Sequence, residues 1–302
     1  MLKYFITVLY LALVAVSCSS GRDPETGSMR EDADLLADYG EVEVSQFVVE
    51  SIISDLSSII EKAAFLKEIG VPFNEQYIAS TTNVDKISGN EHLIAFNLGV
   101  LASNLGYLSM YQRFDEVPEY VENISRLTGK MNMEELIDFE ILLRFARTQG
   151  NMDSLVYLSV HGYNRLNEYF IRNNREHLST AMVTGLFLEG LYLLTQAAGS
   201  NQSNDLAERI GEQKILINDL LLAMRYYQGE FEPLKEMADE LEKIKKEFQD
   251  VSITYEMGEP ETVEKDGKLM IIQNEKSRVE ITGETLARIT ANTRSLRNDL
   301  LY

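Results

Sequence analysis

Cysteine is almost absent from this chain, which has one, Cys18, among 302 residues. An intramolecular disulfide is therefore impossible, and a zinc site built on paired cysteines is excluded as well. Histidine is scarce too, since the chain has only His92, His161 and His177. No two of them stand four residues apart on one helix, which is the spacing of a helical metal motif. We therefore expect no metal site and no cofactor, and we interpret each histidine as an ordinary helix residue.

The motifs of common catalytic and nucleotide-binding sites are also missing. The chain has no Gly-x-Ser-x-Gly elbow, no glycine-rich phosphate loop and no dinucleotide fingerprint. It has 28 Lys and Arg against 48 Asp and Glu, a formal net charge of −20. Phosphate binding needs clustered basic residues, so we expect no nucleic-acid partner. With so many carboxylates a chance acidic pair is certain, and we interpret the acidic runs as solvated surface.

The one cysteine ends an apolar run that is typical of a bacterial lipoprotein signal. Lys3 precedes an apolar stretch from Phe5 to Val16, and Ala15-Val16-Ser17 stands directly before Cys18. About 12 apolar residues are too few for a membrane-spanning helix, which needs about 20. The stretch also lacks the polar positions of a buried amphipathic helix. In lipoproteins the cysteine is acylated and the peptide is cut before it, so we predict a signal peptide at 1–17 and lipidation of Cys18.

Lipid on Cys18 would hold the protein to the membrane of the cell envelope. Each buried methylene contributes about 0.8 kcal/mol, and two or three chains on one residue hold a protein durably. Ser19 follows the cysteine, where an aspartate would resemble an inner-membrane retention signal. We therefore predict the outer membrane, with the protein facing the periplasm or the cell surface. Residues 18–40 are rich in Ser, Gly, Asp and Glu and are predicted to form a flexible tether.

Residues 41–302 are predicted to form a single, mainly α-helical domain. Between Ser45 and Asp250 apolar residues recur at three and four positions, and capping residues separate successive segments. We expect a multi-helix antiparallel bundle with short connections. Asn132 with Glu135 resembles a capping box that would start its fourth helix. The predicted helices are 45–70, 90–111, 115–129, 132–150, 153–173, 177–198, 204–228 and 234–248.

Two of these helices, 90–111 and 177–198, are apolar around their whole circumference, which predicts that they lie at the centre. The first carries a narrow stripe of small residues that would let another backbone approach closely, namely Ala95, Gly99, Ala102 and Gly106. Gly106-Tyr107-Leu108 is echoed about 84 residues later by Gly190-Leu191-Tyr192. The echo hints at duplicated helical hairpins, loosely like a tetratricopeptide array but without its repeat of about 34 residues.

The periodicity changes to two after Asp250. Ser252–Met257 alternates, and Asp266-Gly267 is a strong signal for a two-residue hairpin turn. We predict a small C-terminal β-hairpin or meander at about 251–282, inserted before a final helix at about 284–300 that Thr282 or Thr285 caps. Alone such an insertion would be marginal, so it should pack on the bundle.

Four segments resemble a family of uncharacterised helical lipoproteins from Bacteroidota: Asn83–Lys86, Asn97–Val100, Glu189–Tyr192 and Ser277–Leu300. The resemblance would cover most of the mature chain. It implies a helical domain exported on a lipid anchor, and it implies no reaction.

Glu189 is the carboxylate that the sequence sets apart, because it lies inside the apolar helix 177–198. A charge buried there must find a partner, face a cavity or be protonated. Asn97 and Asn104 lie near one another on the face opposite the small-residue stripe. The structural interpretation is an ion pair or a helix-end hydrogen bond for Glu189 and backbone-bonded amides for the two asparagines. The functional interpretation is a ligand pocket lined by all three residues.

Two functions therefore remain open on the sequence. The first is a non-enzymatic helical binding or scaffolding module, held at the envelope by lipid, that uses its acidic face or a helical groove for a protein partner. The alternative is an enzyme or small-ligand binder with a carboxylate-centred pocket around Glu189. A cavity enclosing Glu189 with other polar groups would favour the alternative, whereas an arginine that saturates Glu189 would favour the module.

Overall fold

A computed structural model of the chain describes residues 59–82, 84–87, 89–148, 152–201, 203–257, 261–265, 268–272 and 275–301. All of them belong to one compact unit, Val44–Tyr302. The predicted signal peptide, the tether and Cys18 lie outside the described residues, as does the first part of the helix predicted from Ser45.

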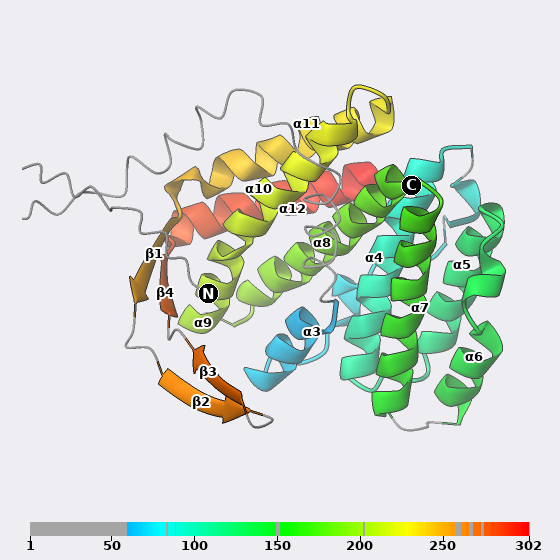
Figure 1. Ribbon diagram of the computed structural model, residues 1–302, viewed down its shortest axis with the longest axis horizontal. Helices are drawn as coiled ribbons and strands as arrows, with labels where there is room; N and C mark the ends of the chain where they lie inside the picture. The colour runs from blue at the N-terminus through cyan, green and yellow to red at the C-terminus, as the bar shows by residue number, and fades with distance from the viewer. Residues whose placement is uncertain are drawn as a thin grey trace, which may run out of the picture. The chain divides into compact units, whose positions relative to one another are not determined.

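The described part of the chain is mainly helical, as the sequence predicts (Figure 1). Its α-helices are α3 (Ile59–Glu68), α4 (Glu91–Met110), α5 (Val117–Lys130), α6 (Phe139–Arg147), α7 (Met152–Arg172), α8 (Glu176–Ala198), α9 (Asn204–Gly211), α10 (Gln213–Tyr227), α11 (Glu232–Glu247) and α12 (Gly283–Leu300). Single 3-10 turns are η1 (Glu75–Tyr77), η2 (Val84–Lys86), η3 (Glu134–Leu136) and η4 (Phe248–Asp250).

Several helices begin at the residue that the sequence indicates. The Asn90 side chain accepts hydrogen bonds from the N–H groups of His92 and Leu93 at 3.0 and 3.2 Å, which caps α4. Thr282 caps α12 in the same way, with the N–H of Thr285 as donor at 3.1 Å. These caps satisfy backbone donors that the first turn of a helix leaves free.

The capping box predicted at Asn132 is wrong. Asn132 has a φ of 56° and ends α5, because its turn lets the N–H of Met133 donate to the carbonyl of Thr128 at 2.9 Å. Asparagine tolerates this left-handed conformation better than most residues, so it can close a helix as glycine does. Helix α6 begins later, where the Asp138 side chain accepts from the N–H of Ile141 at 3.0 Å.

The helix predicted over 204–228 is divided into α9 and α10 at Gly211. A Cβ at Gly211 would lie 2.3 Å from Cγ1 of Val279 and 3.2 Å from Cγ1 of Val251. Because Gly211 has no side chain, Val251 and Val279 of the insertion have room to pack on the helical core. This contact agrees with the expectation that the insertion packs on the bundle.

The insertion is a nested pair of antiparallel ladders and not a meander. Strand β1 (Ser252–Met257) pairs with β4 (Glu275–Glu280), and β2 (Glu261–Lys265) pairs with β3 (Lys268–Ile272). Lys265 lies opposite Lys268, which is the register of the predicted two-residue turn. The strands lie at the end of the domain away from α5 and α6 (Figure 1).

Eight of the ten described α-helices, all except α3 and α9, form two rings of four with the same connectivity. In the first ring α4 packs against α5 and α7, and α6 packs against the same two helices. In the second ring α8 packs against α10 and α12, and α11 packs against the same two. The rings meet through α4 and α8, which form the most extensive contact between any two described elements. The sequence echo predicted duplicated helical hairpins, whereas the unit that recurs in the structure has four helices.

The two central helices run parallel to each other, so the predicted antiparallel arrangement does not extend to them. His92 meets His177 near the start of both helices, and Asn104 meets Glu189 twelve residues further along both. Their backbones touch at two glycines, since a Cβ at Gly99 would lie 1.9 Å from the carbonyl oxygen of Met182, and one at Gly185 would lie 1.9 Å from that of Phe96.

Candidate functional site

Glu189 lies at the contact between the two rings, fully buried on α8. Arg297 of α12 donates from Nε to Oε2 at 2.6 Å and from Nη2 to Oε1 at 2.8 Å. Asn104 of α4 adds a third hydrogen bond from Nδ2 to Oε1 at 2.9 Å. A bidentate arginine and an amide together neutralise the carboxylate and occupy both of its oxygens.

The partners of Glu189 are held in place by contacts of their own. The Arg297 guanidinium stands over the Tyr192 ring with its carbon 4.0 Å from the ring centroid, which is a favourable position for a cation. Asn104 also donates to the carbonyl of Val100 at 2.9 Å, and its Oδ1 accepts from the N–H of Ala79 at 3.2 Å. The cluster therefore ties α4, α8, α12 and the segment before η2 together.

Asn97 does not join this cluster through any hydrogen bond found among the described residues. It is 2% exposed, and its Nδ2 donates to the carbonyl of Leu93 one turn earlier at 2.9 Å. The structure thus brings together Glu189 and Asn104 but not all three residues that the sequence singled out. Both asparagines bond the backbone of their own helix, as the structural interpretation expects.

A second cluster, which the sequence reasoning missed, lies at the N-termini of the central helices. His177 Nδ1 and His92 Nε2 are 2.9 Å apart, and the His177 ring stacks on Phe231 with centroids 3.9 Å apart and planes at 11°. An ion pair between Arg175 and Glu91, 2.7 Å long, lies beside the histidines. The signal for this cluster was available, since His92 and His177 are 85 positions apart, close to the offset of about 84 between the repeated motifs.

Burial lowers the pKa values of both histidines, and the effect is larger for His177. With the charges of His92 and Arg175 adding to burial, the pKa of His177 falls to about 4. The pKa of His92 is also lowered by burial, with a contribution from Arg175 that Glu91 opposes. Both rings are therefore neutral near pH 7, where one can donate its N–H to the other.

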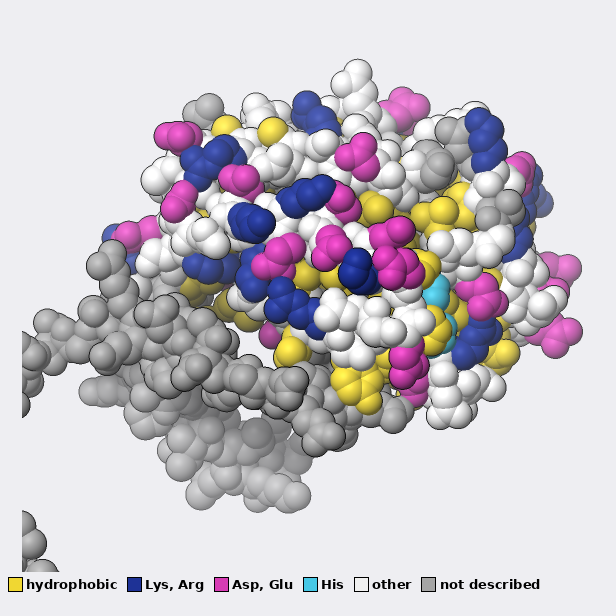
Figure 2. All heavy atoms as spheres, turned by 90° about the horizontal axis from the view of Figure 1, so that it is seen from above, with side chains coloured by type: hydrophobic (Ala, Val, Ile, Leu, Met, Phe, Trp, Pro, Cys, Tyr) yellow, Lys and Arg dark blue, Asp and Glu magenta, His cyan; other side chains and the backbone are white. Residues whose placement is uncertain are grey.

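The described surface and core add three further observations. Histidine side chains reach the surface beside hydrophobic ones, and acidic and basic side chains intermingle over the same face (Figure 2). No group of three or more His, Cys, Asp or Glu side chains among the described residues is placed to hold a metal ion.

Helices α4 and α8 are long and apolar enough to cross a membrane. However, 83% of the most apolar 18-residue stretch of α4 and 100% of that of α8 are buried inside the domain, as in core helices.

Comparison with known proteins gives no match to a family model, to a curated protein or to a solved structure. The resemblance to helical lipoproteins of Bacteroidota therefore stays a prediction from the sequence.

Proposed function

We propose that this protein is an exported, lipid-anchored helical binding or scaffolding module and not an enzyme. The observation that carries the proposal is the saturation of Glu189 by Arg297 and Asn104. A catalytic carboxylate needs an oxygen that can reach a substrate. Glu189 is 0% exposed, and three protein donors already occupy its two oxygens.

The alternative, a ligand or substrate pocket centred on Glu189, lacks support from the cavities of the described domain. An apolar cavity lies between α4, α5, α6 and α7, and a shallow groove runs between the end of α8 and α12. Glu189, Asn97 and Asn104 line neither of them. We therefore assign the Glu189 cluster the role of fixing α12 against the two central helices.

Helix α10 offers a protein partner a place to bind. Ile215, Leu222 and Tyr226 fall on one side of it, at spacings of seven and four, and are 41, 39 and 44% exposed. The opposite side of α10 packs on α8 and α11. A chain with net charge −20 favours a partner that surrounds its apolar contact residues with basic ones.

Affinity capture with the lipidated protein tests this binding surface. Leu222→Glu should abolish recovery of a specific partner, because it places a charge in the centre of the apolar stripe. Tyr157→Glu is the matched control, since Tyr157 is 66% exposed on α7 and should leave recovery unchanged. Partner recovery that is equal for the two variants, or a co-purified small ligand with no protein, would contradict the proposal.

The anchor is tested separately through Cys18. Cys18→Ser should abolish incorporation of radiolabelled palmitate, block normal signal processing and release or mislocalise the protein, because serine cannot take the place of the thiol in lipidation. Ser20→Ala, two positions further on, should behave as the unmodified protein does. Unchanged membrane fractionation of Cys18→Ser would refute the lipoprotein assignment.

A further inference from the structure

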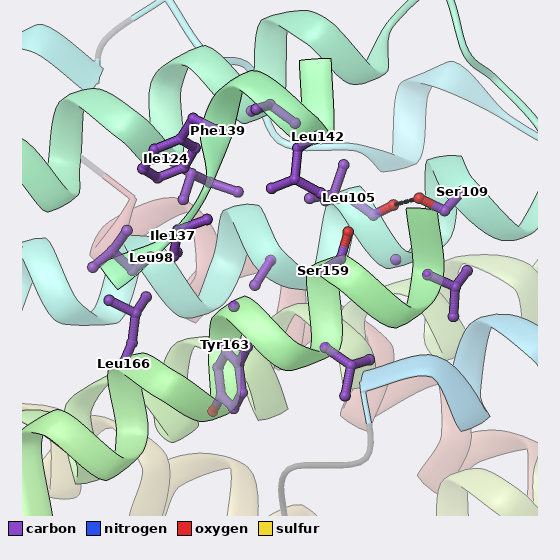
Figure 3. A pocket seen from close by; sticks show the side chains of 16 residues that line it. Leu98, Leu105, Ser109, Ile124, Ile137, Phe139, Leu142, Ser159, Tyr163 and Leu166 are labelled. Atoms are coloured by element: carbon purple, nitrogen blue, oxygen red, sulfur yellow. Dashed lines mark hydrogen bonds between the residues drawn. The ribbon is translucent and has the colours of Figure 1, made fainter. Parts of the chain in front are cut away.

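The first ring of helices encloses an apolar cavity of about 40 Å³ (Figure 3). Its walls come from α4, α5, α6 and α7, together with Ile137 just before α6. One ordered water needs about 10–15 Å³ measured in this way, so the cavity has room for about three. It is therefore larger than an ordinary packing defect.

The cavity is long and narrow. Its lining residues run along α4 from Leu98 to Ser109 and along α7 from Val156 to Leu166. At a rise of 1.5 Å per residue both stretches cover roughly 15 Å of helix. A cavity with this small volume and this length is a narrow slot, about as wide as one methylene chain.

The walls of the slot offer a ligand almost nothing polar. No charged side chain lines it. Its two serines donate within their own helices, Ser109 to the carbonyl of Leu105 at 2.6 Å and Ser159 to that of Leu155 at 2.8 Å. Tyr163 adds a third hydroxyl to a lining that is otherwise apolar. The slot therefore suits a hydrocarbon and would leave a charged group without a counter-charge.

The sequence keeps this space open at a cost to helix stability. Gly162 lies inside α7 and lines the slot, and a Cβ there would come no closer than 3.4 Å to Ile137. At Gly99 and Gly185 an added Cβ would collide with the backbone of a neighbouring helix, whereas at Gly162 the nearest atoms belong to the Ile137 side chain. Glycine inside a helix is less stable than alanine, so an alanine would both fill the slot and strengthen α7.

The outer wall of the slot is the least firmly held part of the ring. Helix α6 has nine residues, of which only Leu142 and Ala146 are buried, and it packs mainly against α5 and α7. Outward movement of α6 would lengthen and widen the slot while exposing few buried side chains. This gives a chain-shaped ligand a way in.

We propose that the slot between α4, α5, α6 and α7 binds an alkyl chain, the hydrocarbon part of a fatty acid or of a lipid. The head group would remain in solvent beside α6, because no charged side chain lines the slot. This activity is independent of the protein-binding role proposed above.

The test is a fluorescence titration of the full chain with cis-parinaric acid, whose emission rises in an apolar site. The chain carries Cys18→Ser, so that no acyl chain of its own competes. Every variant then keeps the same apolar segment 1–17, so only a difference between variants reports on the slot. We expect saturable binding that Ala102→Leu weakens about tenfold, since the leucine adds three carbon atoms and the loss corresponds to about two displaced methylenes of the ligand. Ala291→Leu, the same change in the shallow groove between the end of α8 and α12, should leave the affinity unchanged, which separates the slot from that groove.

Gly162→Ala keeps the test decisive if Ala102→Leu does not fold. It should raise the thermal midpoint and weaken parinaric acid binding by about threefold, whereas Gly129→Ala on α5, where a Cβ meets nothing within 4 Å, should not change the affinity. Competition with decanoate and with lysophosphatidylcholine then separates a free fatty acid from a lipid chain, by which of them displaces the probe at lower concentration. No saturable binding, or equal binding by all four variants, would overturn the proposal.

Discussion

At the scale of single residues, the buried pair of Glu189 and Arg297 decides how α12 docks. Both side chains are buried, so the charge of each is stabilised only because the other supplies the opposite charge. The sequence identified Glu189 as a residue that needs a partner. It could not name Arg297, which lies 108 positions away and resembles any other arginine of an amphipathic helix.

Removal of one charge from this pair should be strongly destabilising. We expect Glu189→Gln to lower the free energy of unfolding by about 3–5 kcal/mol, because Arg297 would stay buried without a counter-charge. The double variant Glu189→Leu with Arg297→Leu should lose less than Glu189→Gln, because it leaves no unpaired buried charge. Urea denaturation measures both.

A surface ion pair is the control for that experiment. Arg172 and Glu168 are 3.2 Å apart on α7 with side chains 77 and 59% exposed, so Arg172→Gln should change the unfolding free energy by no more than about 0.5 kcal/mol. A Glu189→Gln variant that is equally mild would show that the buried pair does not hold α12.

The histidine pair predicts a loss of stability in acid. The pKa of His177 is about 4 in the folded protein and about 6.5 in the unfolded chain, so the unfolded state binds more protons between these values. Stability from this group is present above about pH 6.5 and is lost as the pH falls toward 4. Solvent on the open side of the pair screens part of the effect, which leaves about 1–2 kcal/mol.

Urea denaturation at pH 7 and at about pH 4.5 measures this loss. His177→Gln should reduce the difference between the two pH values, because glutamine does not titrate. His161→Gln, an exposed position on α7, should keep it. An unchanged pH dependence in His177→Gln would mean that other groups cause the loss.

At the scale of elements, the approach of α4 to α8 is the contact that the sequence predicted most directly. The small-residue stripe is correct at Gly99, but Ala102 and Gly106 of the same stripe line the apolar slot instead. Periodicity shows which residues share a helix face. It does not show whether a backbone or an empty space lies opposite them.

The sequence predicts a helix end well where the capping residue fits only the start or only the end of a helix. It does not where the same residue fits both. Asn90 can only start a helix in its context, and it does. Asn132 can start one helix or end another, and the choice depends on the left-handed turn that closes α5. Gln112 and Asn174 follow α4 and α7 with the same positive φ, so this is a repeated way of ending helices in the chain.

Gly99→Ala should separate the two central helices. The new Cβ would lie 1.9 Å from the carbonyl oxygen of Met182, which cannot move without α8. We expect a loss of about 3 kcal/mol or more in the free energy of unfolding. Gly129→Ala on α5 meets no atom within 4 Å and should be neutral or stabilising by up to about 1 kcal/mol. Equal stability of the two variants would show that the glycine contact is not tight.

At the scale of the whole molecule, two rings of four helices share one interface. Sequence repetition indicated this only weakly, because the rings diverge: the second contains the Glu189–Arg297 pair and the strand insertion, while the first contains the apolar slot. His92 and His177 are 85 positions apart in the sequence, and so are Asn104 and Glu189. Both pairs meet across the contact between α4 and α8. That offset differs by one residue from the spacing of about 84 between Gly106-Tyr107-Leu108 and Gly190-Leu191-Tyr192. One residue turns a helix by about 100°, so the repeat indicates the level at which α4 and α8 meet but not which residues face each other.

The net charge of the whole chain predicts how the protein responds to salt. Even if each of the 28 basic residues paired with one acidic residue, 20 of the 48 acidic residues would have no partner. Their repulsion weakens the compact state and is screened over about 8–10 Å near 0.1–0.15 M salt. Exposed pairs such as Arg288 with Asp250, 2.6 Å apart, are weakened by the same screening, so the two effects compete.

We expect repulsion to dominate, so that the thermal midpoint rises by about 2–4 °C between about 10 and 150 mM NaCl. Glu134→Lys with Glu135→Lys, two exposed positions on η3, should raise the midpoint at low salt and reduce its dependence on salt. Differential scanning calorimetry of both proteins at the two salt concentrations measures this. A midpoint that falls with added salt would mean that the surface ion pairs outweigh the excess negative charge, and the charge-reversed protein would then show the steeper fall.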